Sequence, residues 1–150
     1  MAKNMQSTGF RALNVDAYNE DQYEEDGDVD TPGIGPDETS VQQALAQGRL
    51  FDALQGALAN PPLKTKNQAQ KERAVGLMMS VLTAFKSPDM DAAIGRLQPA
   101  DLDLLIKYIY KGFERPADGS SAILLTWHEK IFAKAGLGCI VRNFTDRKRL

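Results

Sequence analysis

From residue 37 onward, apolar residues recur every three or four positions, which is the spacing of amphipathic α-helices. Glycine, proline and capping residues divide this region into separate helices. The predicted helices span residues 37–47, 49–59, 65–86, 87–97, 99–112, 122–135 and 139–144. The nearest approach to a strand is the segment IVRNF, which is short and stands alone. The pattern predicts an all-α fold of about seven helices with short connections, stacked as an αα-superhelix.

The predicted helix boundaries depend on a few residue types. Asp37 or Ser40 is the expected side-chain N-cap of the first helix, and Thr65, in a capping box with Gln68, is that of the third. Ser87, followed by Pro88, is expected to cap the fourth helix, and Ser120 or Ser121 the sixth. Glycine ends a helix readily because it accepts the left-handed conformation at the C-terminus. Gly48, Gly112 and Gly136 are the expected stops of this kind.

The segment Leu104–Phe113, LLIKYIYKGF, is apolar on almost every side of a helix. Asp103, Lys107 and Lys111 lie four residues apart and should form its one narrow exposed line. We therefore expect this helix at the centre of the fold, packed against residues 78–85 and 123–132. A folded region of roughly 100 residues leaves little chain to cover all three helices. Apolar surface should remain for another subunit.

The first 36 residues lack helical or strand periodicity and predict an extended acidic arm and linker, separate from a helical domain at 37–150. Residues 1–39 hold two basic and ten acidic residues, a net charge of −8, whereas residues 40–150 carry +6. The arm cannot build a core, but its scattered anchor residues could dock on another protein. The candidate partner-binding residues of the arm are Phe10, Arg11, Leu13, Val15, Tyr18 and Tyr23.

The residues that could carry chemistry are few. The chain has one histidine, His128, and one cysteine, Cys139, and neither lies in a recognised nucleophile motif. The single cysteine excludes an intrachain disulfide, and with no apolar leader or spanning segment it favours an intracellular protein without membrane insertion. We expect no catalytic residue, cofactor or metal site. The basic end, with Arg142 and Arg147–Arg149, is a weak signal for nucleic acid, and none is expected as a partner.

Asp26, Asp28 and Asp30 resemble the start of a calcium loop, with Asp37 at the twelfth position. Thr31 replaces the glycine that the loop turn needs, Pro32 follows it, and no helix enters the loop. An acidic linker is the better interpretation.

Three blocks of sequence are similar to one known family. ALANPPLKTKNQAQKERA, LLIKYIYKGFERPADGSSAILLTWHEK and GLGCIVRNFTDRK resemble the 16-kilodalton subunit (subunit five) of the actin-related protein 2/3 complex. The likeness runs from about Val41 to the C-terminus, and Phe10-Arg11 with Val15-Asp16-Ala17-Tyr18 extends it loosely into the arm. The residues 12–14 between these two groups differ from the more basic ones associated with that family.

The resemblance implies a helical subunit without enzymatic activity, in the complex that nucleates branched actin filaments on existing filaments. It implies that the helical block packs on the 20-kilodalton subunit near the 40-kilodalton propeller subunit, and that the arm reaches actin-related protein two. Localisation in the cytoplasm, on the actin cytoskeleton, follows from the same resemblance. The candidate partner-binding residues of the block are Tyr108, Tyr110, Phe113, Trp127, His128 and Arg142.

Two other hypotheses stay open on the sequence. The first is a stand-alone helical adaptor that binds acidic peptides through a basic surface, which predicts a monomer without an exposed apolar face. The second is an enzyme that uses His128 and Cys139 as a dyad.

Overall fold

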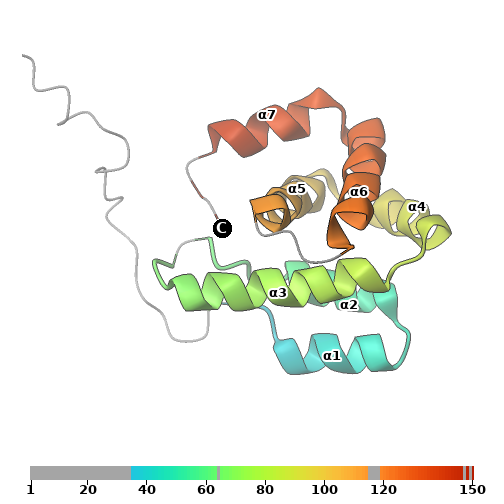
Figure 1. The fold of residues 1–150 in the computed structure, drawn as a ribbon, viewed down its shortest axis with the longest axis vertical. Helices are drawn as coiled ribbons and strands as arrows, with labels where there is room; N and C mark the ends of the chain where they lie inside the picture. Colours follow the sequence, from blue (N-terminus) through green and yellow to red (C-terminus); the bar gives the residue numbers. More distant parts are fainter. Residues whose placement is uncertain (1–34, 64, 115–118, 147, 149) are drawn as a thin grey trace, which may run out of the picture.

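The computed structural model describes residues 35–63, 65–114, 119–146, 148 and 150. These residues form seven α-helices and no strand, which confirms the all-α prediction (Figure 1). The helices are α1 Glu38–Ala46, α2 Leu50–Leu58, α3 Gln68–Ala84, α4 Ser87–Arg96, α5 Pro99–Glu114, α6 Ser120–Ala135 and α7 Leu137–Thr145. The predicted arm, with its six candidate residues and the loop at Asp26–Asp30, lies outside the described residues.

The helices stack in layers. Helix α1 packs on α2, α2 packs on α3, and α5 follows with α3 on one side and α7 on the other. Helix α6 packs against α5 and α4, and Figure 1 shows α1 and α7 at opposite ends of the stack. Each end layer covers only one side of its neighbour, so α7 has one face packed on α5 and the opposite face open.

Helix α5 lies at the centre of the core, as predicted. Its side chains at Leu105, Ile106 and Ile109 are completely buried, and α3 and α6 pack against it. Burial of each such aliphatic side chain contributes roughly 1.5–3 kcal/mol to folding. The long apolar segment is therefore covered mainly by its own chain.

The cap of the first helix is confirmed, and three others differ from the prediction. The Asp37 carboxylate accepts from the backbone N–H of Thr39 at 3.1 Å, and hydrogen bonds from the Thr39 and Ser40 side chains lower its pKa to about 2. Helix α3 is capped by Asn67 rather than by the predicted Thr65 box, because the Asn67 side chain accepts from Ala69 N–H at 3.1 Å. The Thr65 hydroxyl instead accepts from Asn67 N–H at 3.0 Å.

The two serine caps are also corrected. Ser87 is the first residue of α4, and Lys86 occupies the cap position without a side-chain hydrogen bond. Gly119, with φ of 78°, occupies the N-cap of α6, so the serine at 120 lies inside the helix. Pro88 lies in the first turn of α4, where the missing N–H costs nothing.

Gly112 does not end α5, which continues to Glu114. A Cβ atom at Gly112 would lie 2.8 Å from Met79 Sδ and 2.9 Å from Leu124 Cδ1. The glycine thus allows α3 and α6 to approach α5 closely. This packing outweighs the cost of a glycine inside a helix, which is about 1 kcal/mol relative to alanine. Gly48, with φ of 72°, and Gly136, with φ of 70°, do follow helix ends as predicted.

Polar contacts fix α6 on α4. The Lys134 ammonium donates to the carbonyl oxygens of Gly95 at 3.0 Å, Leu97 at 3.1 Å and Ile94, and so closes the C-terminus of α4. Lys130 pairs with Asp91 at 2.6 Å. These contacts join the middle and the C-terminal end of α4 to α6.

Candidate interaction surface

The largest exposed apolar side chains of the described residues all lie on the last two helices. They are between 44% and 64% exposed, and they are Leu125 and Phe132 on α6 and Leu137, Val141 and Phe144 on α7. We call these five residues the apolar face. Large apolar side chains gathered on one part of a surface mark interaction sites in soluble proteins. The prediction that apolar surface remains for a partner is consistent with this face.

Helical spacing aligns these residues into two lines. Leu137, Val141 and Phe144 are four and three residues apart, which places them on one side of α7. Leu125 and Phe132 are seven residues apart on α6, and His128 lies between them on the same line. Each helix therefore presents a stripe rather than scattered residues.

Tyr110 of α5 connects the two lines. Its ring contacts the His128 ring at a centroid distance of 5.7 Å and the Phe144 ring at 5.1 Å, both edge to face. The Tyr110 hydroxyl lies 3.2 Å from His128 Nε2, and the Phe113 ring is 6.1 Å from the Tyr110 ring. Burial raises the pKa of Tyr110, with a smaller contribution from Cys139, so the phenol stays neutral. The structure thus brings together three of the six block residues suggested by sequence and resemblance, namely Tyr110, Phe113 and His128.

Tyr108 and Trp127 lie elsewhere. Both side chains are completely buried, and the Trp127 indole donates to the Leu82 carbonyl at 3.2 Å while its ring meets Phe85 edge to face. These two residues fill the core of this chain and present no surface to a partner in this conformation.

The Tyr108 hydroxyl is a buried polar group without a hydrogen-bond partner among the described residues. Burial raises its pKa to about 12, because ionisation in the core is disfavoured. A buried donor that makes no hydrogen bond costs roughly 1–3 kcal/mol of desolvation. The Tyr108 ring is part of the packed core.

We predict that Tyr108→Phe leaves the stability at pH 7 unchanged or raises it, because the substitution removes an unpaired hydroxyl and keeps the ring. A tyrosine whose pKa is raised by folding contributes stability that is lost as pH rises from its unfolded value of 10.0 to its folded value of about 12. Urea unfolding at pH 7 and across pH 10–12 should show a smaller alkaline loss for the variant. A clear loss at pH 7 would mean that the hydroxyl has a partner.

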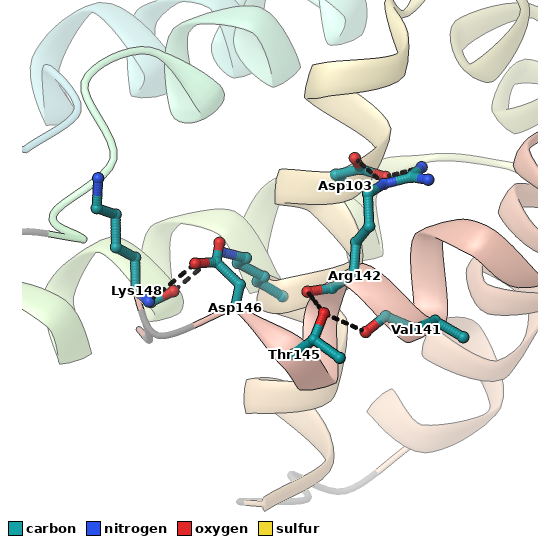
Figure 2. A network of polar contacts seen from close by, with 7 residues as sticks. Asp103, Val141, Arg142, Thr145, Asp146 and Lys148 are labelled. Atoms are coloured by element: carbon teal, nitrogen blue, oxygen red, sulfur yellow. Dashed lines mark hydrogen bonds and ion pairs between the residues drawn. The ribbon is translucent and has the colours of Figure 1, made fainter. Parts of the chain in front are cut away.

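The predicted exposed line on α5 is covered by the C-terminal part of the chain. Arg142 of α7 donates to Asp103 through Nε at 2.7 Å and through Nη2 at 2.8 Å. Lys107 pairs with Asp146 and donates to the Lys148 carbonyl at 2.9 Å, and its side chain is only 11% exposed. Figure 2 shows these contacts at the end of α7, with the Lys148 side chain directed away from Asp146. Asp103 and Lys107 thus form a seam that fixes α7 on α5, whereas Lys111 pairs within α5 with Glu114.

Arg142, a candidate contact residue, has its charge engaged inside the chain. Its guanidinium forms a two-bonded pair with Asp103, while the side chain remains 56% exposed. The pair orients α7 and thereby the apolar stripe on its other side. Any contact of Arg142 with a partner would be made in addition to this pair.

The surroundings of Cys139 are those of a packed thiol. Its side chain is completely buried and donates to the Gly136 carbonyl at 3.1 Å. Burial, followed by the charge of Asp103, raises the pKa of the thiol, whereas a nucleophilic cysteine needs a lowered pKa. His128 contacts Tyr110, and among the described residues no group of three or more His, Cys, Asp or Glu side chains could hold a metal ion. In the same part of the chain, no helix combines the length and apolar character needed to span a bilayer.

Sequence reasoning named none of the five residues of the apolar face. The segments AILLTWHEKIFAKA and LGCIVRNF are apolar on more than one side, so their periodicity does not say which side is covered. Tyr108 and Trp127 were predicted as partner-binding residues because they are aromatic. Large aromatic side chains, however, are important in cores as well as in interfaces. The exposed side is decided by where α5 lies.

The chain matches one protein family over residues 9–150, that of the ARP2/3 complex 16 kDa subunit (p16-Arc). It is 49% identical to actin-related protein 2/3 complex subunit 5-B of Xenopus laevis, and the match covers 99% of each chain. It is 46% identical to the Homo sapiens actin-related protein 2/3 complex subunit 5-like protein, again over 99% of both. The similarity extends to a probable subunit 5 of Caenorhabditis elegans, 36% identical over 97% of this chain and 100% of that protein.

Proposed function

The chain belongs to the family of the ARP2/3 complex 16 kDa subunit, and from this premise we propose that it is a non-catalytic structural subunit of that complex. The complex nucleates branched actin filaments, so the role of this chain is assembly in the cytoplasm, on the actin cytoskeleton. The observation that carries the proposal is the similarity over essentially the whole of each relative. The apolar face supports the proposal independently, because large apolar side chains exposed together on a surface mark a site of contact with another protein.

The helical block, residues 37–150, is the anchored part of the subunit. Its apolar face on α6 and α7 provides the contact with neighbouring subunits, with Tyr110, Phe113, His128 and Arg142 along its edge. From the family resemblance, the neighbours are the 20-kilodalton subunit and, nearby, the 40-kilodalton propeller subunit. Interfaces concentrate their binding free energy in a few well-packed apolar and aromatic anchors. Tyr110 and Arg142 are of the residue types enriched among such anchors, and Phe132 and Phe144 add aromatic surface.

The arm, residues 1–36, is the tethering part. Phe10, Arg11, Leu13, Val15, Tyr18 and Tyr23 are its anchors for actin-related protein two. A flexible linker spans about 5–6 Å times the square root of its residue number, and like charges extend it further. Tethering raises the effective concentration of a second contact to roughly millimolar. The arm would thus keep actin-related protein two with the complex while that subunit moves.

The stand-alone adaptor is the alternative. It requires a monomer without an exposed apolar face, and the residues exposed on α6 and α7 count against it. Analytical ultracentrifugation of the purified chain distinguishes the adaptor from the subunit. A compact monomer at high concentration favours the adaptor. Self-association through the apolar face favours a subunit whose partners are absent.

The direct test is affinity purification of the tagged full-length chain from cell extract. We expect the actin-related proteins and the other subunits of the complex in the eluate at comparable amounts. Actin itself should also be recovered to the extent that filaments stay bound to the complex. A tag at the N-terminus and a tag at the C-terminus should be compared, because either end could lie in an interface. Recovery of the chain alone with both tags would contradict the proposal.

We predict that a chain lacking residues 1–36 still assembles but retains less actin-related protein two. The block keeps all five residues of the apolar face, whereas the tether is lost. Quantitative mass spectrometry of the purified complex, washed at rising salt, measures the ratio of actin-related protein two to the other subunits. A scrambled arm of the same composition is the matched control, since it keeps length and charge. Loss of every subunit on truncation would contradict the tether.

A further inference from the structure

A groove of about 550 Å³ runs beside the apolar face. It lies between the C-terminal half of α5 and the end of α7, and the final residues of the chain close it. It is lined by Lys107, Tyr110, Lys111, Phe113, Glu114, Asn143, Phe144, Lys148 and Leu150. Its lining therefore combines three aromatic rings with three lysines. Phe144 belongs to both the groove and the apolar face, so an occupant of the groove also covers part of the face.

The charges in the groove differ in how firmly they are held. Lys107 is nearly buried and engaged with Asp146 and the Lys148 carbonyl. Lys111, whose side chain is 23% exposed, pairs at 2.8 Å with Glu114, whose side chain is 62% exposed; a pair with one partner in solvent is weak, on the order of 1 kcal/mol. Lys148 is exposed, and Figure 2 shows its ammonium directed away from Asp146. Lys111 and Lys148 are thus the ammonium groups that an acidic occupant could engage.

The chain itself contains a segment of complementary composition. Residues 18–26 read YNEDQYEED, with five carboxylates around two tyrosines. The carboxylates match Lys111 and Lys148, and a tyrosine ring matches the aromatic lining at Tyr110, Phe113 and Phe144. Aromatic pairs contribute roughly 0.5–1.5 kcal/mol beyond the area they bury. Glu114 would have to exchange its partner or turn outward.

The segment is within reach of the groove. The described chain begins at Gly35, which lies beside Gln70 and Arg73 near the start of α3. In Figure 1 the start of α3 and the C-terminus lie toward the same side of the molecule. The connecting residues 27–34 span about 16 Å at rest, and at most about 28 Å when fully extended. These lengths exceed the radius of gyration of the block, about 13 Å for a domain of this size.

We propose that residues 18–26 dock in this groove when the chain is not assembled, and so shield Phe144 and the adjoining part of the apolar face. The contact itself does not depend on the proposed function. Its role does, because an unassembled subunit would otherwise expose the apolar face to water. On assembly the neighbouring subunits displace the segment, and the arm becomes free to engage its own partner. Release of the arm is thereby coupled to binding at the apolar face, because the segment leaves the groove only when neighbouring subunits bind there.

Paramagnetic NMR on the full-length free chain tests the contact. Cys139 is first replaced by alanine, and a nitroxide label is then attached through Gln22→Cys, in the middle of the segment, so that both tyrosines are kept. We expect the amide signals of Lys111, Glu114, Phe144 and Lys148 to lose more than half of their intensity, and those of α1 to be unaffected. The same label placed through Thr8→Cys, near the start of the arm, is the positional control and should leave the groove signals mostly intact.

Charge reversal supplies the matched comparison. Lys111→Glu with Lys148→Glu should restore the groove signals, whereas Arg49→Glu with Lys86→Glu, the same charge change elsewhere on the block, should not. Circular dichroism of each variant verifies the helical content. Salt of about 0.5 M should weaken the effect, because it screens exposed charges.

Three outcomes would overturn the proposal: no loss of signal at the groove, an equal loss over the whole block, or a loss that appears only between labelled and isotope-enriched copies in a mixed sample. The last would place the arm on a second copy. Because the readout uses the isolated chain, it does not depend on whether the chain assembles into the complex. Failure of the co-purification and failure of this contact are therefore separate results.

Discussion

Trp127→Ala is expected to lower the free energy of unfolding by about 3–5 kcal/mol, the cost of deleting a buried aromatic side chain. The Trp127 side chain is completely buried, and it packs against the C-terminal end of α3 at Leu82 and Phe85. The variant also loses the edge-to-face contact with Phe85 and leaves the Leu82 carbonyl without the indole donor. Since small domains are stable by only about 5–15 kcal/mol, much of the block's stability depends on this residue.

Urea unfolding followed by circular dichroism at 222 nm measures the effect. Trp127→Phe is the informative intermediate, because it keeps most of the ring and the contact with Phe85 but removes the indole N–H; we expect it to cost about 1–2 kcal/mol. Leu125→Ala is the matched control on the same helix, and at 59% exposure it should change stability by less than about 0.5 kcal/mol. If Trp127→Ala and Leu125→Ala had the same effect, the placement of Trp127 in the core would be wrong.

The helices and their order could be predicted because they depend on local chemistry. The 3.6-residue periodicity and the residues Asp37, Gly48 and Gly136 act within a few positions of the chain, and the structure confirms each. The errors at Thr65 and Ser87 are of one kind. Several polar residues stood near each helix start, and which of them caps depends on the path by which the chain enters the helix.

Gly112 shows where local reasoning fails for a physical reason. As a sequence signal, a glycine after YIYK favours a helix end. The residues that explain it, Met79 and Leu124, lie on two other helices, and the contact of their side chains with the backbone at Gly112 keeps α5 intact. A helix end and a close approach of helices both favour glycine, so only the fold distinguishes them.

The same limit applies to the polar line on α5. The spacing of Asp103 and Lys107 correctly placed them on one side of the helix, but their partners Arg142 and Asp146 are each 39 residues further along the chain. Long-range ion pairs leave no periodic signal. What looked like a solvated line is the seam that holds α7 and thereby orients the apolar face, so the site could be inferred only once α7 was placed.

The arrangement of α7 leads to the second large effect. We predict that Leu137→Glu together with Val141→Glu abolishes assembly with the other subunits while the block stays folded. Both side chains are at least 50% exposed, so little packing is lost within the chain, and a glutamate at the first residue of α7 interacts favourably with the helix dipole. In the assembled state, however, two carboxylates would have to be buried without partners in an apolar contact. Truncation of a central anchor commonly costs about 2 kcal/mol or more, and a buried unpaired charge costs more than truncation.

Co-purification of the other subunits with the tagged variant should therefore fall by at least about 30-fold, the equivalent of roughly 2 kcal/mol for one lost anchor. Gln42→Glu with Gln43→Glu introduces the same charge on exposed positions of α1, at the opposite end of the stack, and should assemble normally. Thermal unfolding of both variants separates loss of contact from loss of fold. If the α7 variant assembled as well as the α1 variant, the anchoring surface would have to lie elsewhere on the block, and the shielding of Phe144 by the arm would no longer protect an interface.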